Sequence, residues 1–574
     1  MTMRAATEPH PRAASFVDLF TPKLVTILRE GYGLGQLRSD AVAGLTVAIV
    51  ALPLSLAIAI ASGASPAQGL YTAIIGGFLV SALGGSRFQI GGPAGAFIVL
   101  VAATVQAHGI DGLILATVLS GLIMVAVGFV QLGTFIKFIP YPVTVGFTAG
   151  IAVIIFASQF KELFGLRLDG PEPGSLLEKL PVLWEGLGTL DPVTGMLSFA
   201  TIIAILGIKR IKPHWPGMLL AVGAAAAATS LLALPVSTIG TAFGGIPSNL
   251  PMPQLPAITL DKVLAVLPSA AAFALLGSIE SLLSAVVADG MTGRRHRSNC
   301  ELVAQGIANV GSGLFGGFCV TGTIARTATN VRAGAHGPVA GMLHAAFLLL
   351  FVVVAAPLAS FIPLASLAGV LAIVAWTMVE KHAFATLLRA SWGDAAVLMI
   401  TFLLTILYGL VEAIVVGFAL GSVLFIHRMS QTTAVETRAP FVPFDKPDNA
   451  NGGRIPYDET AASDPDVVVY RISGAFFFGA AASIGTVLER IADTHRLLVI
   501  DFTAVPFLDS TAANTVKSLA HNARRRRVKV VLTGTSHNMR RELFALGIKP
   551  PLVSYERSVE VAVSKSRKAS AADA

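Results

Sequence analysis

The stretch Gly316-Gly-Phe-Cys-Val-Thr-Gly-Thr-Ile-Ala-Arg-Thr-Ala-Thr-Asn330 lies in a long hydrophobic region, yet it carries paired glycines, several hydroxyls and Arg326. A lone arginine at membrane depth is costly unless it faces a wet cavity or a partner. Glycines permit non-helical backbone, which a membrane tolerates only where protein surrounds it or it lines a cavity. A helix that starts near Thr321 or Thr323 would point its free N–H groups into that cavity. The stretch therefore predicts an anion pocket. The alternative is that Arg326 snorkels or pairs inside a packed bundle.

A second stretch, Gly91-Gly-Pro-Ala-Gly-Ala-Phe97, has the same character in the third hydrophobic segment. It also places paired glycines before a short apolar run. Two short segments interrupted by Gly or Pro, at matching places in two halves of a chain, indicate a transporter site near the bilayer midplane. The pair is more informative than either stretch alone, because a glycine-rich membrane protein contains Gly-Gly pairs by chance.

The composition is that of a membrane protein with many spans. Of 574 residues, 54% are hydrophobic and only 13% are charged, and the mean hydropathy is +0.74. The net charge of +8 is spread over loops and tail, so we predict no nucleic-acid partner. Two cysteines, Cys300 and Cys319, predict neither a disulfide framework nor a metal site, and we expect no cofactor. No removable signal peptide is predicted in the first 37 residues, so the first span acts as its own insertion signal.

Hydrophobic periodicity predicts seven spans in each half of the chain. The first span should be capped by Ser39-Asp40 and kinked or broken at Pro53. The predicted spans are 41–61, 68–83, 92–106, 112–131, 138–160, 194–209 and 215–234, then 262–289, 301–316, 322–332, 337–357, 364–379, 393–409 and 411–428.

Basic residues alternate between the loops, which predicts the topology. Loops after odd-numbered spans are nearly free of them, apart from Lys161, Arg167 and Lys179 in one long loop. The positive-inside rule then places both termini in the cytoplasm and the chain in the cytoplasmic (inner) membrane. Seven spans per half insert the halves in opposite orientations, as inverted repeats. Loops after even-numbered spans hold Arg87; Lys137; Lys209, Arg210 and Lys212; Arg294, Arg295 and Arg297; Arg332; Lys381 and Arg389; and Arg428.

The C-terminal part of the chain changes to a soluble composition. Strand patterns at 467–472, 497–502 and 529–533 alternate with helix patterns at 480–493, 511–523 and 538–546, which predicts a small α/β domain. Arg524-Arg-Arg-Arg527 ends one helix and is interpreted as a solvated terminus that could touch anionic lipid. The predicted boundaries are an N-terminal segment 1–38, a transport domain 39–430, a linker 431–464, the α/β domain 465–565 and a flexible tail 566–574.

Several motifs closely resemble the SulP family of anion permeases, in the right order over about residues 20–565. They are Ala43-Gly-Leu-Thr-Val-Ala-Ile-Val-Ala-Leu-Pro53, Gly69-Leu-Tyr-Thr72, Gly91-Gly-Pro-Ala-Gly95, Ser278-Ile-Glu-Ser281, Glu301-Leu-Val-Ala-Gln-Gly-Ile-Ala-Asn309, Gly322-Thr-Ile-Ala-Arg-Thr327 and Asn330-Val-Arg-Ala-Gly334. In the tail, Asp501-Phe-Thr-Ala-Val-Pro-Phe-Leu-Asp-Ser510 is similar to a STAS domain.

The resemblance implies a polytopic helical fold of about fourteen spans in 7+7 inverted repeats, a core domain that moves against a gate domain, and a cytoplasmic STAS domain. It also implies a homodimer. The anion would sit between the short third and tenth helices, where the residues themselves predict it. The expected binding residues are Gly92, Ala94, Gly95, Ala96, Thr323, Ile324, Ala325 and Arg326.

The chain departs from some bacterial members, which carry an acid linked to proton coupling directly after the first-span proline. Here Pro53 is followed by Leu54 and Ser55. Glu280 is then the carboxylate predicted deep in a span, with Ser284 one turn further on the same helix face. The two resemble the acid and hydroxyl that help to hold the cation in sodium-coupled relatives. The alternative is a neutral Glu280 kept for packing. We expect Asp289, His296 and Glu412 to be interfacial.

The leading hypothesis is a secondary anion transporter, coupled to a proton or sodium ion, with sulfate as the family default. A C4-dicarboxylate or bicarbonate symporter and an uncoupled channel stay open; the stretch Ala288-Asp-Gly-Met-Thr-Gly293 is somewhat similar to dicarboxylate members. An enzyme is not expected, because no nucleophile lies beside a base. Ser510 follows Asp509 where related anti-sigma antagonists are phosphorylated, so it is either a regulatory site or a simple helix cap.

Overall fold

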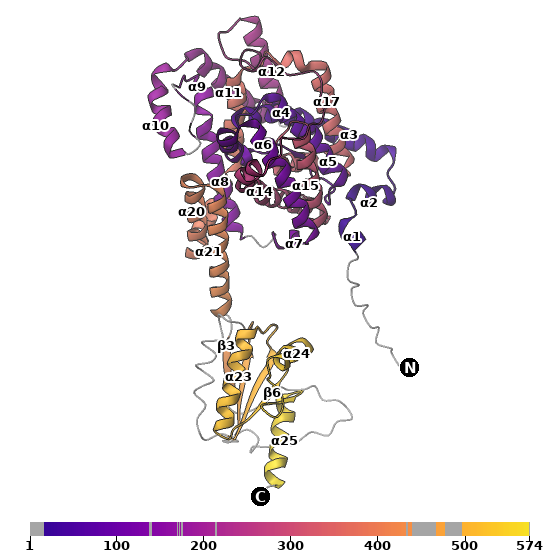
Figure 1. Cartoon of the computed structure of the whole chain (residues 1–574), viewed down its shortest axis with the longest axis vertical. Helices are drawn as coiled ribbons and strands as arrows, with labels where there is room; N and C mark the ends of the chain where they lie inside the picture. Colours follow the sequence, from indigo (N-terminus) through magenta and orange to yellow (C-terminus); the bar gives the residue numbers. More distant parts are fainter. Residues whose placement is uncertain are drawn as a thin grey trace. The chain divides into compact units, whose positions relative to one another are not determined.

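The computed structural model describes residues 16–136, 140–168, 170, 173, 176–212, 215–431, 434–438, 467–476 and 496–572. The chain divides into two compact units, Met1–Ala419 and Leu420–Ala574 (Figure 1). The first unit is helical apart from one pair of two-residue strands, and the second unit contains a five-stranded sheet. We describe each unit by itself.

The first half of the helical unit opens with two short helices, α1 (Phe16–Phe20) and α2 (Lys23–Glu30), before the long helix α3 (Leu34–Ala61). Its remaining elements are α4 (Pro66–Tyr71), η1 (Thr72–Gly76), α5 (Gly77–Leu83), β1 (Gly91–Gly92), η2 (Gly95–Phe97), α6 (Ile98–Phe129), α7 (Gly133–Ile136), α8 (Tyr141–Ser158), α9 (Phe160–Phe164), α10 (Leu176–Gly186), η3 (Leu187–Thr189), α11 (Pro192–Ile211), α12 (Gly217–Leu231) and α13 (Ile239–Phe243). The helices α9 and α10 lie in the segment predicted as one long loop.

The second half begins with α14 (Leu260–Thr292) and again places a two-residue strand before a helix. Both halves therefore contain the same unusual step, from a glycine-rich strand into a helix. The remaining elements are α15 (Ser298–Leu314), β2 (Thr321–Gly322), α16 (Ile324–Arg332), α17 (Val339–Ala359), α18 (Leu364–Met378), α19 (Lys381–Ala390), α20 (Trp392–Leu407) and α21 (Leu410–Gln431).

Within the described residues, nine helical segments are long and apolar enough to cross a membrane. They confirm a protein with many spans, while the count of fourteen stays a prediction. The helix α6 is broken at Gly109, whose φ of 68° and ψ of −175° are non-helical, so it consists of two segments. These two segments correspond to the separate spans predicted at 92–106 and 112–131. Pro53 lies inside α3, which continues through it from Leu34 to Ala61, so the helix is not broken there and a kink stays a prediction.

The predicted cap of the first span is wrong. The helix α3 begins at Leu34, so Asp40 lies inside it and is fully buried. Its carboxylate accepts hydrogen bonds from the backbone N–H of His336 at 2.5 Å and of Gly337 at 3.1 Å, just before α17. It also accepts one from the Tyr32 hydroxyl at 2.7 Å. Asp40 therefore satisfies free N–H groups near the start of a distant helix, rather than those of its own.

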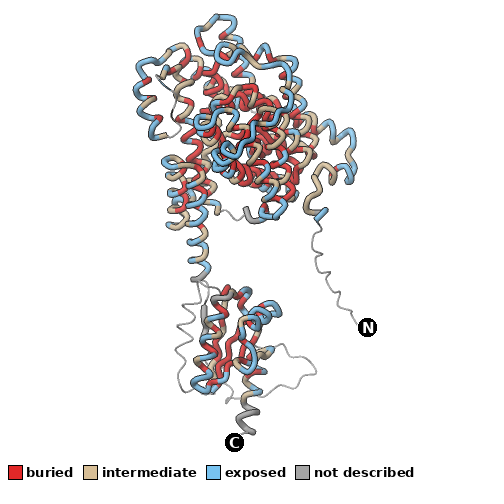
Figure 2. Tube along the Cα trace, in the orientation of Figure 1, coloured by how far each residue is buried: buried red, intermediate tan, exposed pale blue. Residues whose placement is uncertain are grey.

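The interior of the helical unit depends on close contact between small residues, and Figure 2 shows its buried residues gathered in the centre of the bundle. The helices α6 and α15 meet at Gly121 and Gly306. A Cβ built on either glycine would lie 2.5 Å from the carbonyl oxygen of the other. Small residues allow such backbone contact, which stabilises helix pairs in membranes by packing.

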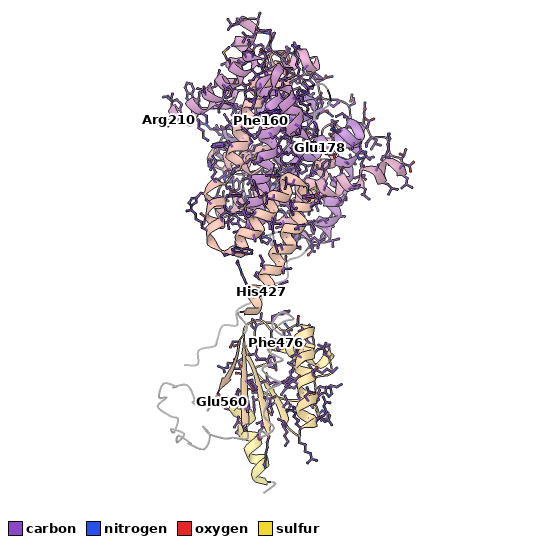
Figure 3. The ribbon with its side chains drawn as sticks, turned by 90° about the vertical axis from the view of Figure 1, so that its left-hand side faces the viewer. Phe160, Glu178, Arg210, His427, Phe476 and Glu560 are labelled. Carbon is purple, nitrogen blue, oxygen red and sulfur yellow. The ribbon has the colours of Figure 1, made fainter. Side chains whose placement is uncertain are left out.

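The second unit is an α/β domain whose sheet order is β3-β4-β5-β6-β7. The strand β3 (Ala434–Arg438) pairs antiparallel with β4 (Val467–Ser473), and β5 (Leu497–Ala504), β6 (Lys529–Thr533) and β7 (Ser554–Glu556) continue the sheet in parallel. The helices α23 (Ser510–Arg525) and α24 (His537–Ala545) contribute to one hydrophobic core, which includes the fully buried Phe476 labelled in Figure 3. The helix α25 (Val559–Ala572) packs on a second cluster formed with β4, β5 and β6.

Two predictions for this unit need comment. The strand β3 lies inside the segment 431–464 that was predicted as a linker, so the sheet begins before the predicted domain boundary. This edge strand pairs with a partner more than thirty residues away, and its five residues, Ala434-Val-Glu-Thr-Arg438, give no local signal of that pairing. The helix predicted at Ala480–Asp493 lies outside the described residues.

Candidate functional site

The site is built on the two strands that interrupt the helical unit. The strands β1 and β2 pair antiparallel, with Gly91 opposite Gly322 and Gly92 opposite Thr321. Both strands are buried, and each satisfies backbone groups of the other. Pairing of this kind makes non-helical backbone tolerable at membrane depth, because no N–H or C=O is left facing lipid. The pairing brings together the two glycine-rich stretches that the sequence singled out.

A helix starts directly after each strand. After β2, Thr323 has extended backbone geometry and forms the N-cap of α16, which begins at Ile324; this confirms the predicted helix start. After β1, Ala94 precedes the 3₁₀ turn η2, which continues into α6. Because the strands are antiparallel, the two helices start at opposite ends of the pair and lead away from it. Their free N–H groups and positive dipole ends therefore both lie near the strands.

Arg326 is the charged group of the site. Its side chain is 1% exposed. Its Nη2 donates to the Ser55 hydroxyl of α3 and to the Pro93 carbonyl, both at 3.2 Å. Its Nε and Nη1 have no hydrogen-bond partner among the described residues. A buried N–H without an acceptor costs about 1–3 kcal/mol, so the guanidinium presents two donor nitrogens, Nε and Nη1, whose N–H groups an anion would satisfy.

Gly92 lies against this guanidinium. A Cβ built on Gly92 would overlap Nη1 of Arg326, so every other residue type at position 92 would displace the arginine. Gly92, the second glycine of the Gly91-Gly92 pair, is therefore needed because only a residue without a side chain leaves room for the Arg326 guanidinium. Gly95, in contrast, has ordinary side-chain neighbours, Ile155 at 3.3 Å and Met378 at 3.6 Å from a built Cβ.

The other expected binding residues occupy the two helix starts. Ala94 and Ala96 are buried, Gly95 is half-buried and Thr323 is 8% exposed. Ile324 and Ala325, the first two residues of α16, are exposed. The structure thus gathers Gly92, Thr323 and Arg326 around the strand pair. No contact ties Ile324 or Ala325 to Arg326 among the described residues beyond their position in the same helical turn.

Hydroxyls on α14 connect this helix to the site. Ser284 Oγ donates to Thr327 Oγ1 of α16 at 3.0 Å. Thr327 Oγ1 in turn accepts from the Ile90 N–H at 3.2 Å, next to β1. One turn before Ser284, Ser281 accepts from Gln89 Nε2 at 2.9 Å. Two serines of α14 therefore contact both strand segments, and a shift of α14 would be felt at each of them.

Glu280 lies on α14 between these contacts. It is half-buried, and its carboxylate has no hydrogen bond or ion pair with any described residue. The structure therefore places Ser284 in the site network and places Glu280 beside it, without a direct link between the two side chains.

A cavity of about 330 Å³ lies between α3 and α6 on one side and α8 and α18 on the other, and none of the expected binding residues lines it. Small residues, including Ala57, Ala61 and Ala102, line its α3 and α6 walls. Ser55, which holds Arg326, lies two residues before Ala57 on α3. Gln159 and Lys161 line the end of the cavity formed by α8 and α9. The cavity is thus wide enough for a small hydrated ion and contains polar groups.

Three residues of the site were not predicted as site residues. Ser55 stands two positions after Pro53, but its role depends on Arg326, which is 271 residues away. Thr327 was inside the decisive stretch, yet nothing in its spacing singles it out from the neighbouring hydroxyls. Gln89 precedes the first glycine pair, and its Oε1 is buried without a partner among the described residues. A polar residue two positions before a buried Gly-Gly pair is the signal that could have indicated it.

Two further predictions can be located. No group of three His, Cys, Asp or Glu side chains able to hold a metal ion is found in the described part of the chain.

Ser510 is the first residue of α23, whereas the N-cap is Asp509, whose carboxylate accepts from the Ala512 N–H at 2.8 Å. The hypothesis that Ser510 caps this helix is therefore wrong, because the preceding aspartate already occupies the cap position.

Known proteins with similar sequences and folds agree with this architecture. The model of the sulfate permease family matches residues 37–401, and that of the STAS domain matches residues 460–562. A putative sulfate transporter of Bacillus subtilis, YvdB, is 37% identical over 522 residues, which cover 90% of this chain and 95% of that protein. The bicarbonate transporter BicA of Synechocystis is 32% identical over 527 residues, or 89% of this chain and 91% of that protein.

Solved structures show the same fold. The transmembrane domain of a cyanobacterial bicarbonate transporter BicA matches with a TM-score of 0.60 and 30% identity, over 68% of this chain and 98% of that one. The overall structure of SLC26A9 matches with a TM-score of 0.80 over 100% of this chain and 99% of that one, and at 16% identity it supports the fold alone. The fold is that of a helical membrane transporter with a C-terminal STAS domain. The chain belongs to the sulfate permease family.

Proposed function

We propose that this protein is a secondary active transporter of small anions, and that the anion binds between the starts of η2 and α16. One observation carries the proposal: Arg326 is buried with two donor nitrogens, Nε and Nη1, unpartnered among the described residues, beside a glycine at position 92 where any side chain would overlap it. Charge-assisted hydrogen bonds to an anion would satisfy these donors, and the two helix N-termini would add favourable partial charge. The proposed binding residues are Gly92, Ala94, Gly95, Ala96, Thr323, Ile324, Ala325 and Arg326.

Alternating access would follow from movement along the cavity between α3 and α6 and the facing helices α8 and α18. The strand pair and Arg326 belong with α3, α6, α14 and α16, while α8 and α18 form the opposite wall of the cavity. Transporters built from repeats expose a fixed site to either side by moving one group of helices against the other. The cavity, with its small side chains on α3 and α6, supports such a sliding surface. An uncoupled channel would need a continuous opening instead.

We assign the coupling role to Glu280 and Ser284, with a proton or sodium ion as the coupling cation. Ser284 contacts Thr327, one residue after Arg326, so α14 can transmit the state of a cation site to the anion site. An intramembrane carboxylate is costly unless it serves a function or finds a partner. Glu280 has no partner among the described side chains and a half-buried position, which suits a group that binds and releases a cation during each cycle.

Sulfate is the first candidate substrate and bicarbonate is the second. The relative with 37% identity is named as a putative sulfate transporter, and those with 32% and 30% identity are named as bicarbonate transporters. A C4-dicarboxylate stays an alternative from the sequence stretch at 288–293. We further propose a homodimer in the cytoplasmic membrane, with both termini in the cytoplasm, and a transport rather than an enzymatic role.

Uptake into proteoliposomes tests this function directly. Labelled sulfate, bicarbonate and succinate are supplied separately, with an imposed proton gradient, a sodium gradient or neither. Concentrative uptake of one anion under one gradient is expected, and it names both the substrate and the coupling ion. Equal, gradient-independent fluxes of all three anions would instead establish a channel.

The coupling role is tested by Glu280→Gln, which keeps the shape of the side chain and removes its charge. Gradient-driven accumulation should be lost while exchange of substrate across the membrane continues. Glu412→Gln removes the same charge from an exposed position at the start of α21 and is the matched control. Wild-type accumulation by Glu280→Gln would place the coupling site elsewhere.

A further inference from the structure

The STAS unit contains a groove that the transport function does not use. It has a volume of about 360 Å³ and lies between the C-terminal end of α23, the start of β6 and the segment 550–554. Its cationic lining residues are Arg524, Arg527 and Lys529, and its apolar lining includes Val530 and Leu552. The described residues that line it include no acidic side chain.

The three cations are held together without compensation. Neither the guanidinium groups of Arg524 and Arg527 nor the Lys529 ammonium has a hydrogen bond or an ion pair with any described residue. A helix C-terminus favours nearby cations through its dipole, which accounts for Arg524 inside the last turn of α23. It accounts less well for Arg527 and Lys529, which lie beyond the helix. Like charges gathered at one concave surface repel each other and attract an anion.

The backbone of Arg527 gives independent support. Its φ is +63°, in the left-handed region where a side chain costs energy and glycine is usual. The chain has the same turn after α24, where the corresponding residue is Gly547 with φ +82°. In both turns the following N–H donates to the carbonyl five residues back: Val528 to Ala523 and Ile548 to Leu543, each at 2.9 Å. The same helix-ending turn thus carries glycine at one site and a strained arginine at the other.

A strained residue that persists where glycine would fit better indicates a use for its side chain. We propose that this groove binds an oxyanion of two or more charges, namely the phosphate group of a small phosphorylated molecule or of a lipid headgroup. Arginine matches tetrahedral oxyanions through its planar fork of donors, and lysine adds a point charge. The apolar lining at Val530 and Leu552 would contact the uncharged part of such a ligand.

Binding to the full-length protein in nonionic detergent tests the proposal. Titration calorimetry with sodium pyrophosphate probes a free phosphate compound, and dihexanoyl phosphatidate below its critical micelle concentration probes a headgroup. Both titrations use an Arg326→Ala background, so that the membrane site does not contribute. Arg527→Ala and Lys529→Ala should each weaken binding about tenfold, as expected for the loss of one charge-assisted contact. Arg541→Ala removes the same charge from an exposed position on α24 outside the groove and should bind as the parent does.

A second variant separates binding from folding. Arg527→Gly should relieve the left-handed backbone and raise the melting temperature of the STAS transition by about 4 °C, while it weakens anion binding. Arg527→Lys should retain most of the binding without the gain in melting temperature. Tighter binding of one probe identifies the source of the phosphate. The proposal is overturned if neither probe binds, or if the Arg524, Arg527 and Lys529 triple alanine variant binds both as the parent does.

Discussion

Two arginines, one in each unit, show opposite ways to accommodate a charge: Arg326 is fully buried, whereas the Arg471 side chain is 26% exposed. Arg471 of β4 lies opposite Asp501 of β5, and its Nε donates to the aspartate at 2.7 Å. Arg326 of α16 meets a hydroxyl and a backbone carbonyl, and it has no carboxylate partner among the described residues. Asp501 is further satisfied by Thr503 and Thr533. The STAS pair is complete within the fold, whereas the membrane arginine retains free donors.

The difference separates a structural charge from a ligand-binding one. An ion pair whose carboxylate is buried and fully hydrogen-bonded, as Asp501 is, contributes to one fixed arrangement of strands. A buried cation with unsatisfied donors costs free energy in the empty protein and recovers it on binding an anion. Removing either arginine should therefore damage different properties, ligand binding in one unit and stability in the other.

The largest effect is expected from Arg326→Ala. The loss of a charge-assisted contact in a buried site costs about 1.5–3 kcal/mol, so anion affinity should weaken about tenfold or more and transport should be abolished. Membrane insertion and thermal stability should stay near wild type, because no carboxylate is left unpaired. Binding of labelled anion to the purified variant is the measurement. Unchanged affinity would make Arg326 a structural residue like Arg471.

Gly92→Ala should damage the same site by size rather than by charge. The added Cβ overlaps Nη1 of Arg326 and would displace the guanidinium from Ser55 and Pro93. The larger Gly92→Val should be worse, and neither defect should depend on salt concentration. The control is Gly207→Ala in α11, where a built Cβ meets nothing within 4 Å. Normal transport by Gly92→Ala would contradict the packing against Arg326.

Arg471→Ala should lower the stability of the STAS unit without affecting anion binding in the membrane unit. Asp501 is 1% exposed and would lose one partner while it keeps Thr503, so we expect a loss of about 1–3 kcal/mol. Native-state hydrogen exchange of β5 amides in the full-length protein measures it. The exposed pair Lys565–Glu556 is the comparison, and Lys565→Ala should cost under about 1 kcal/mol.

The same pair gives this unit a defined acid sensitivity. Burial by itself would raise the pKa of Asp501, but hydrogen bonds from Thr503 and Arg471 outweigh it and hold the pKa below its ordinary value. The lowered pKa contributes stability that is present above the unfolded value of about 3.9 and is lost as pH falls through the folded value. In Arg471→Ala the folded pKa should rise toward the unfolded one. Stability of the variant should then change less than that of wild type between about pH 4 and pH 2.

The smallest effect is expected at the start of α23. Asp509→Ala removes the N-cap and should cost about 1 kcal/mol, whereas Ser510→Ala should cost less than about 0.5 kcal/mol. If Ser510 is instead a regulatory site, phosphate should appear on it in cells and Ser510→Asp should change the transport rate at equal protein level. Mass spectrometry without a phosphopeptide, together with equal rates, would leave Ser510 without a regulatory role.

Local features of the chain predicted the main elements of the fold. Apart from the start of α3, apolar runs and their Gly and Pro interruptions predicted the long helices within a few residues of those observed, and of the two helix starts expected, near Thr321 or Thr323, the structure has the second. Arg326 stood out as a charge at membrane depth. Gly92 stood out as one of a glycine pair that permits non-helical backbone there. These are properties of a residue and its near neighbours, so they can be recognised from the amino-acid sequence alone.

Contacts between distant segments were decided only by the tertiary structure. Asp40 was expected to cap its own helix but instead binds N–H groups 296 and 297 residues away. Ser55, which holds Arg326, is 271 residues from it, and β3 joins the sheet from within a predicted linker. A hydroxyl or carboxylate can satisfy many donors equally well by itself. Packing of the helices and strands selects the one donor that each acceptor meets. That selection brings polar residues from distant parts of the sequence together in one site.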